Sequence, residues 1–166
     1  LIVAVIAAST AHGAARVQDG VTLVNDRPFF PLSCAGGSIE MNRRLGMNTG
    51  MLGAPTSLER VEKTREAMRE WGRHGFPVTL GMGFGAESVD LWSLEATRLS
   101  TALSNEPNLL AWYVADDVQL KHIPSLRDMS RILIEKTPEI PRIADYYSTR
   151  SDLARETMRE MIDIRI

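Results

Sequence analysis

The sequence predicts an α/β fold in which helices cover a parallel sheet. Between residues 49 and 162, apolar segments of strand length alternate with amphipathic segments of helix length about five times. The strand segments are continuously apolar, as in FPVTLG (76–81) and LLAWYVA (109–115). Such strands are typical of parallel sheets, because helices bury both faces of those sheets.

The first elements expected are a short β-hairpin, a short helix and a strand. The hairpin spans residues 21–34 (VTLVNDRPFFPLSC), with its turn at Asn25 and Asp26. The helix covers residues 38–46 and is closed by Gly46. The strand covers residues 49–55 and leads into a turn.

The clearest helix of the sequence begins after Pro55. Thr56 and Glu59 have the spacing of a capping box at its start, and Gly75 is expected to end it. Apolar residues at helical spacing predict its buried face, and they are Leu58, Val61, Met68 and Trp71.

The remaining segments continue the alternation. Strands are expected at residues 76–85, 109–115 and 140–147, and helices at residues 87–103, 124–136 and 151–162. Trp112 and Tyr113, inside the second of these strands, are expected in the core. The last residues, IRI (164–166), have the composition of a strand that is just beginning.

Two architectures fit this order of elements. A complete doubly wound sheet of five or six strands takes about this length. A (β/α)8 TIM barrel typically needs about 250 residues, so the 166 residues would form its first two-thirds, about five to six βα units after the N-terminal hairpin. Ending on a bare strand favours the partial barrel.

The first residues predict export. LIVAVIAA (1–8) is an unbroken apolar run followed by small residues, as in the apolar and cleavage regions of a secretory signal peptide. We therefore expect a truncated signal peptide over residues 1–15 and the barrel domain over residues 16–166. The run is too short for a stable membrane span, which needs about 20 residues. A buried N-terminal strand or helix is the alternative.

Composition argues against several classes of partner. The chain has 19 basic and 21 acidic residues and a net charge of −2, so neither a nucleic-acid groove nor a polybasic membrane patch is expected. The single cysteine, Cys34, is expected to be a small buried core residue.

No cofactor or metal is expected either. The run GMGFG (81–85) lacks the GxGxxG spacing and the lysine of phosphate-binding loops. His12, His74 and His122 are scattered and lack metal-ligand spacing.

Four motifs resemble one family across residues 21–147. They are VNDRPFFP (24–31) before the first barrel strand, RRLGMNT (43–49), WGRHGFPV (71–78) and NEPNLLAWYVADD (105–117). Together they resemble the secreted glycoside-hydrolase-like TIM-barrel proteins of the large clan that includes β-galactosidases and cellulases. The resemblance implies a carbohydrate partner and hydrolysis of glycosidic bonds.

The resemblance places the candidate general acid at the carboxyl end of strand 109–115. Asp116 and Asp117 match the family's Asp-Glu pair, and Asp117 takes the acid position. A neighbouring carboxylate raises the pKa of such an acid by repulsion between like charges. Aspartate stands where the family has glutamate, and Val118 stands where proline is usual.

Other residues take supporting roles in the same resemblance. Tyr146 and Tyr147 could stack on a sugar ring, Asp145 could bind a sugar hydroxyl, and Phe84 could line the cleft. The nucleophile of retaining relatives follows strand seven, so no residue here is assigned to it. Glu106 lies before its strand, at the end opposite the active site, and is expected to be a solvated loop residue.

Two further functions stay open. A degenerate barrel could be a non-catalytic carbohydrate-binding or surface protein, with Asp116 and Asp117 capping a following helix. A complete doubly wound domain could instead bind a small ligand.

Overall fold

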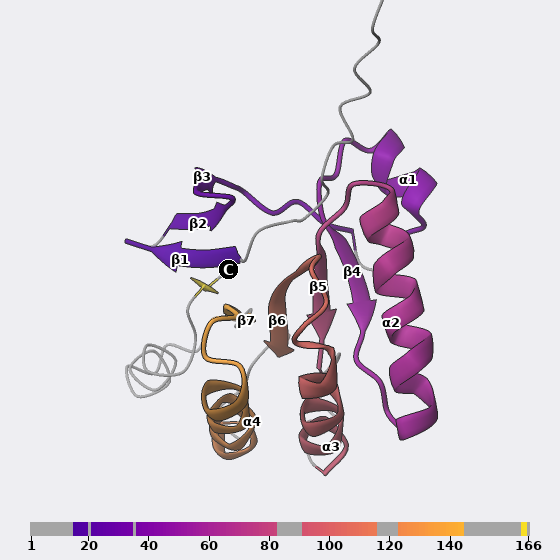
Figure 1. Ribbon diagram of the computed structural model, residues 1–166. Helices are drawn as coiled ribbons and strands as arrows, with labels where there is room; N and C mark the ends of the chain where they lie inside the picture. Colours follow the sequence, from indigo (N-terminus) through magenta and orange to yellow (C-terminus); the bar gives the residue numbers. More distant parts are fainter. Residues whose placement is uncertain are drawn as a thin grey trace, which may run out of the picture.

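The structure is a computed structural model that describes residues 15–19, 21–34, 36–82, 91–115, 123–144 and 164–165. Its fold is mixed α/β, with a small antiparallel sheet of order β1-β2-β3 and a parallel sheet of order β4-β5-β6-β7-β8 (Figure 1). The predicted parallel sheet with its helices is therefore confirmed. Among the described strands the parallel sheet is open, with β4 and β8 at its two ends.

The N-terminal sheet contains the predicted hairpin turn. Its strands are β1 (Ala15–Gln18), β2 (Val21–Val24) and β3 (Arg27–Pro28). Asn25 and Asp26 have φ values of 53° and 60°, the left-handed conformation that suits a tight hairpin turn. The strand after the turn is shorter than expected, and residues 29–34 form none. Pro28 and Pro31 have no N–H group to donate to a ladder, which accounts for the early end.

The short helix and the strand that follows were also predicted. The helix α1 (Ile39–Arg44) is capped by Ser38, whose hydroxyl accepts a hydrogen bond from the backbone N–H of Met41 at 3.1 Å. Gly46, with φ of 71°, ends this segment, and β4 (Gly50–Gly53) follows. Cys34, expected to be buried, is half-buried.

The long helix differs from expectation at its start. The helix α2 (Leu58–Arg73) has Ser57 at its N-cap, without a side-chain capping bond, so the predicted capping box of Thr56 and Glu59 is wrong. Leu58 was expected in the buried face but is 80% exposed, because the first residue of the helix lies beyond the packed face. Val61, Met68 and Trp71 are buried as predicted.

The second half of the described chain follows the predicted order. Its elements are β5 (Val78–Gly81), α3 (Leu91–Ser100), the short 3-10 helix η1 (Thr101–Leu103), β6 (Leu109–Ala115), α4 (Ile123–Lys136), β7 (Arg142–Ala144) and β8 (Ile164–Arg165). The bounds of β6 match the prediction, whereas the described parts of β5 and β7 are shorter than predicted. The helix expected at 151–162 lies outside the described residues.

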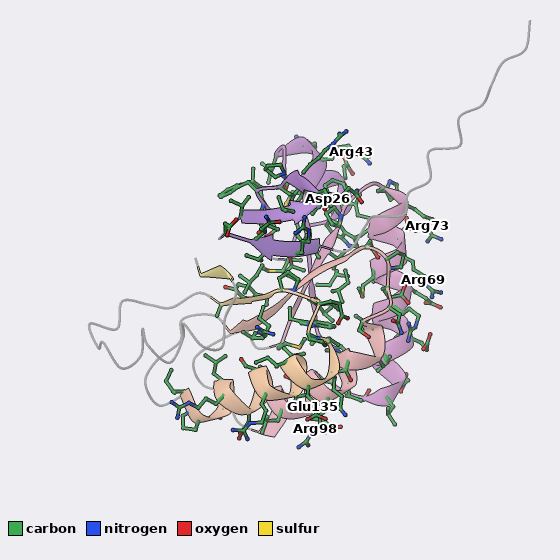
Figure 2. All side chains as sticks on the ribbon, turned by 60° about the vertical axis from the view of Figure 1, so that its left-hand side comes forward. Asp26, Arg43, Arg69, Arg73, Arg98 and Glu135 are labelled. Atoms are coloured by element: carbon green, nitrogen blue, oxygen red, sulfur yellow. The ribbon has the colours of Figure 1, made fainter. Side chains whose placement is uncertain are left out.

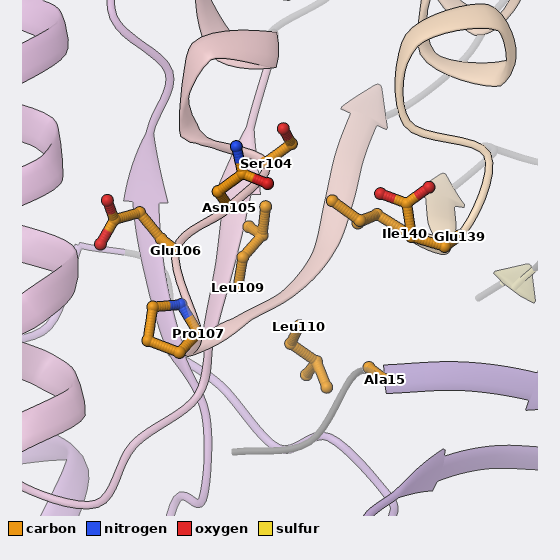
Figure 3. Close-up of a pocket in the computed structure, with 9 residues that line it drawn as sticks. All are labelled: Ala15, Ser104, Asn105, Glu106, Pro107, Leu109, Leu110, Glu139 and Ile140. Atoms are coloured by element: carbon orange, nitrogen blue, oxygen red, sulfur yellow. The ribbon is translucent and has the colours of Figure 1, made fainter. Parts of the chain in front are cut away.

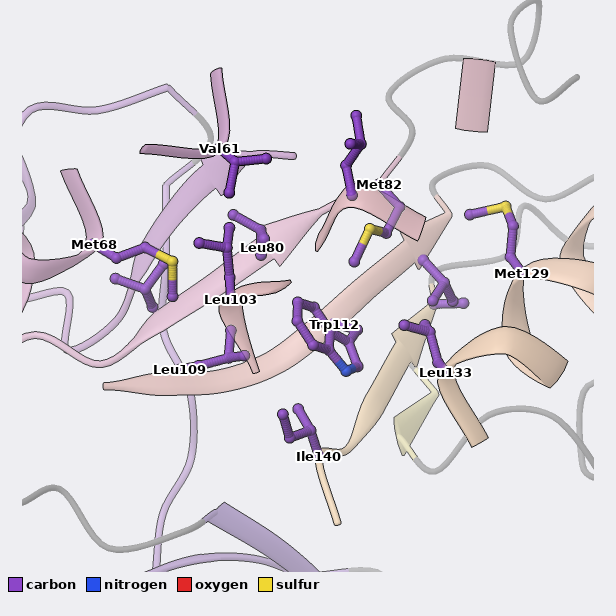
Figure 4. Close-up of a cluster of buried hydrophobic side chains, with 14 of the residues drawn as sticks. Val61, Met68, Leu80, Met82, Leu103, Leu109, Trp112, Met129, Leu133 and Ile140 are labelled. Atoms are coloured by element: carbon purple, nitrogen blue, oxygen red, sulfur yellow. The ribbon is translucent and has the colours of Figure 1, made fainter. Parts of the chain in front are cut away.

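The parallel sheet separates two groups of buried side chains. On the helix side, Trp112, Leu80 and Met68 belong to the larger cluster (Figure 4). On the other face, Tyr113 and Ile143 pack with Ala15 of the hairpin. Trp112 and Tyr113 are thus both in the core, as predicted. Charged side chains such as Arg73 and Glu135 lie outside (Figure 2).

Candidate functional site

The parallel strands direct their carboxyl ends to one edge of the sheet. At this edge β6 ends at Ala115 and β7 ends at Ala144, and these two residues are register partners. Active sites of α/β proteins lie at the carboxyl edge. The predicted site is therefore expected at this edge.

The predicted site residues follow the ends of three neighbouring strands in the sequence. Asp116 and Asp117 come directly after β6, the group Asp145, Tyr146 and Tyr147 comes directly after β7, and Phe84 comes shortly after β5. All six lie outside the described residues, so their roles stay predictions.

The strand that leads to the two aspartates ends with an irregularity. The register of β6 against β7 shifts between Tyr113 and Ala115. A regular strand points successive side chains to opposite faces, and a register shift interrupts that alternation. The experiment below therefore changes each of the two aspartates separately.

Buried polar contacts fix β6 against two helices. At its start, Asn108 donates from Nδ2 to the backbone carbonyl of Met68 in α2 at 2.6 Å. In its middle, the indole N–H of Trp112 donates to the hydroxyl of Thr137 at 2.9 Å, and that hydroxyl donates to the carbonyl of Leu133 in α4 at 3.0 Å. An unpaired donor in the core would lower the free energy of unfolding. These contacts therefore fix the position of β6 along its own axis relative to α2 and α4, and with it the point at which the strand ends.

Glu106 is buried, and the expectation of a solvated loop residue is wrong. It lies in the turn before β6, at the amino edge as expected, but its side chain is only 3% exposed. Arg65 Nη1 donates to its Oε1 at 2.6 Å, and Arg69 donates from Nε to Oε2 at 2.9 Å and from Nη2 to Oε1 at 3.1 Å. The ionic cluster of Arg65, Arg69 and Glu106 therefore joins α2 to the start of β6.

The electrostatics of this cluster exclude Glu106 as a proton donor near neutral pH. Burial raises the pKa of Glu106, but the hydrogen bonds and charges of Arg69 and Arg65 more than offset burial and hold the pKa below its usual value. The group is therefore ionised and accepts hydrogen bonds only. A general acid must be protonated at the working pH.

A pocket of about 170 Å³ lies beside the same turn. Its lining includes Asn105, Glu106, Leu110 and Glu139, at the amino ends of β6 and β7 (Figure 3). Figure 3 shows the Glu106 carboxylate directed away from Glu139. Because its buried acid is already paired with two arginines and it lies at the edge opposite the predicted site, this pocket does not offer a pair of catalytic carboxyls.

Neither a metal centre nor a membrane-spanning helix is found in the described part of the chain. The described residues contain no group of three or more histidine, cysteine, aspartate or glutamate side chains that could hold a metal ion. Within the same part of the chain, every helix is too short or too polar to cross a membrane.

Comparisons with known proteins show similarity at the level of the fold. No protein-family model matches the chain, and no curated protein matches it in sequence. Among solved structures, the FMN-binding β-glucuronidase from Facaelibacterium prausnitzii L2-6 has a TM-score of 0.57 and 15% identity over 93% of this chain. A β-D-glucuronidase from Dictyoglomus thermophilum has a TM-score of 0.54 and 14% identity over 91% of this chain. The YdjI aldolase from Escherichia coli K12 has a TM-score of 0.49 and 20% identity, which is too weak to support an argument.

These matches show a likeness of fold and nothing finer. The β-glucuronidases are glycoside hydrolases with TIM-barrel folds, and the chain spans 27% and 30% of their lengths. At such low identity the likeness concerns the fold, which hosts many chemistries. The resemblance read from the sequence is therefore confirmed as a likeness of fold to glycoside-hydrolase-like TIM-barrel proteins, while a barrel in this chain stays a prediction.

Proposed function

We propose that this chain forms part of a glycoside-hydrolase-like (β/α)8 barrel that hydrolyses glycosidic bonds of a carbohydrate, with Asp117 as its general acid. The observation that carries the proposal is the fold likeness to two β-glucuronidases over 93% and 91% of the chain. The end of β6 at Ala115 supports it, because Asp116 and Asp117 then begin at the carboxyl edge.

The proposed chemistry is protonation of the leaving oxygen. Asp117 donates its proton to the glycosidic oxygen as the bond to the sugar breaks, through an oxocarbenium-like transition state. Asp116 raises the pKa of Asp117 by like-charge repulsion, which keeps Asp117 protonated. The second carboxylate comes from the part of the barrel beyond this chain. Glu106 is not a substitute, because it lies at the opposite edge, where Arg65 and Arg69 occupy its buried carboxylate.

The sugar contacts of the proposal come from the same edge. Tyr146 and Tyr147 stack on a sugar ring, Asp145 accepts a hydrogen bond from a hydroxyl group, and Phe84 lines the cleft. The proposal includes export by the signal peptide expected within residues 1–15, with cleavage before Ala15 because this residue packs against Tyr113 and Ile143. The protein then meets such substrates outside the cell. These roles rest on the position of each residue after its strand.

The test compares Asp117→Asn with Asp116→Asn in the protein that carries this sequence. The substrates are methyl β-glucuronide, methyl β-galactoside and methyl β-glucoside, whose methanol leaving group is poor and needs an acid. Circular dichroism checks that both variants fold. We expect kcat/KM of Asp117→Asn to fall by about 10²–10⁴ and that of Asp116→Asn to fall less. Full activity in Asp117→Asn would remove the acid role.

A non-catalytic carbohydrate-binding protein is the second candidate. The observation that favours it is the departure from the family's motif, with aspartate for glutamate at 117 and valine for proline at 118. An acid that is one methylene shorter reaches the leaving oxygen less easily. Binding of an oligosaccharide by calorimetry, without hydrolysis of any of the three substrates, would select this candidate.

A further inference from the structure

Glycines stand at the carboxyl ends of two neighbouring strands of the parallel sheet. Gly53 is the last residue of β4 and Gly81 is the last residue of β5, and the two are register partners. The row continues with Tyr113 of β6 and Ile143 of β7. The arrows of β4, β5 and β6 all point to this edge in Figure 1. Along the edge, the sheet therefore changes from two large side chains to two positions without a side chain.

This row lies on the face of the sheet that is turned away from the helices. Met51 packs against the cluster that contains Tyr113 and Ile143 on that face. Leu52 packs against the larger cluster on the helix side. Successive residues of a strand point to opposite faces, so Gly53 shares the face of Met51. In the proposed barrel this face is the interior, which side chains fill in layers. Gly53 adds no side chain to the last layer before the mouth of the barrel.

The usual structural reasons for a glycine do not apply to Gly53. Its φ is not positive, and the register of β4 against β5 is regular up to this residue, so there is no bulge. The next residue, Ala54, still donates its N–H group to the carbonyl of Gly81 at 2.7 Å. A Cβ at Gly50 would lie 2.5 Å from Cε3 of Trp71, whereas a Cβ at Gly53 meets no atom of the described residues within 4 Å. Without such reasons, a glycine in a strand marks a place where a ligand or another backbone comes close.

The segment on the other side of β4 also presents glycine at this level and does not fill the place. The carbonyl of Leu32 accepts hydrogen bonds from the two N–H groups that precede β4, so the chain at Leu32 lies beside the start of that strand. This segment leads into a turn, in which the N–H group of Gly37 donates to the carbonyl of Cys34 at 3.5 Å. Gly36 in the turn has a φ of 71°, and a Cβ there would meet no described atom within 4 Å. In the proposed barrel this segment is the first strand, so backbone lines the mouth on this side.

We propose that Gly53 is a specificity-determining residue that makes room for the exocyclic C6 group of the sugar, so that the substrates are hexosides or hexuronides rather than pentosides. The inference rests on the proposed function, in which the glycosidic oxygen meets Asp117 after the end of β6. The strand β4 lies two strand spacings, about 10 Å, from β6. The side chain of Asp117 and the sugar ring together span that distance. The bulkiest group on the far side of the ring then reaches the open space at Gly53.

The test compares glycosides that differ only at C6, in the protein that carries this sequence. Methyl β-xyloside lacks the C6 group of methyl β-glucoside and methyl β-glucuronide, and methyl α-L-arabinopyranoside lacks that of methyl β-galactoside. We expect Gly53→Val to lower kcat/KM for the C6-bearing glycoside, relative to its matched pentoside, by about tenfold or more. The reason is that a single methylene in a pocket changes kcat/KM by about 10–200-fold. Gly53→Ala should change the same ratio in the same direction by less.

Leu52→Val is the matched control, because it changes the neighbouring residue of β4 on the helix side. It should leave the ratio of the two kcat/KM values unchanged even where it lowers stability. A loss of folded protein lowers kcat/KM equally for both members of a matched pair, so the ratio also removes any effect of Gly53→Val on folding. Circular dichroism gives the folded fraction of each variant independently.

The outcomes separate this inference from the proposed function. Hydrolysis by the unchanged protein, with equal losses for hexoside and pentoside in Gly53→Val, would overturn the inference and leave the proposed function standing. A loss that follows the size of the leaving group, from methyl to 4-methylumbelliferyl, would also overturn it. If the unchanged protein hydrolyses none of the glycosides, the proposed hydrolysis falls, and calorimetry with cellotriose and xylotriose, which lacks the C6 groups, decides the inference. Gly53→Val should then weaken the binding of cellotriose alone, whereas equal weakening, or no binding of either sugar, would overturn the inference.

Discussion

Replacing Glu106 by glutamine should destabilise the fold far more than a change at a surface carboxyl. Glu106 is 3% exposed and accepts three hydrogen bonds from Arg65 and Arg69. Removing one partner of a fully buried ion pair costs about 3–5 kcal/mol, because the other charge stays behind in the core. Here the side chains left behind are 19% and 58% exposed, so water solvates part of their charge. We therefore expect Glu106→Gln to lower the free energy of unfolding by about 2–3 kcal/mol.

Urea unfolding followed by circular dichroism measures this change. With a slope of about 2 kcal/mol per molar urea, the midpoint should fall by about 1–1.5 M. Glu62→Gln is the matched control, because Glu62 also contacts Arg65, at 3.2 Å, but is 70% exposed. Its cost should stay below about 0.5 kcal/mol. Equal midpoints of the two variants would refute the view that the buried cluster holds α2 to β6.

Two further predictions concern the same scaffold. The pKa of Glu106 is lower in the folded chain than its usual value of 4.5, so its contribution to stability is present above that pH and is lost as the pH falls through the folded pKa. As the pH falls below 4.5, the wild type should therefore lose stability faster than Glu106→Gln. Parallel curves would assign the acid sensitivity to other carboxyls. In β4, a Cβ at Gly50 would lie 2.5 Å from Cε3 of Trp71, whereas a Cβ at Gly53 meets nothing within 4 Å. Gly50→Ala should cost about 1–3 kcal/mol in urea unfolding and Gly53→Ala about zero or less, and similar costs would contradict the packing of Trp71 on β4.

The alternation of elements could be predicted from the sequence because it depends on local patterns. The bounds of β6 followed from its continuous apolar run, and the hairpin turn followed from Asn25 and Asp26. The start of α2 was misplaced because Thr56 and Ser57 are both acceptable caps, and tertiary context decides between them.

The buried cluster of Glu106 could not be predicted in the same way. Arg65 and Arg69 lie 41 and 37 residues away from Glu106 in the sequence, so only the tertiary fold brings them to it. The sequence does show that the two arginines are four residues apart and so lie on one side of the predicted helix. Arginines on a helix usually face solvent, however, so this spacing does not predict a buried partner. The position of the acidic pair directly after β6 can be predicted because the apolar run before it marks the strand, and the geometry of the pair stays a prediction.

The leaving-group dependence of hydrolysis by Asp117→Asn tests the central claim most directly. A general acid assists departure of a poor leaving group but is not needed for an activated one. For the protein that carries this sequence, kcat/KM of Asp117→Asn should fall by about 10²–10⁴ with a methyl glycoside and by less than about tenfold with the 2,4-dinitrophenyl glycoside of the same sugar. Equal losses with both substrates, in a variant that folds, would contradict the assignment of Asp117 as the general acid.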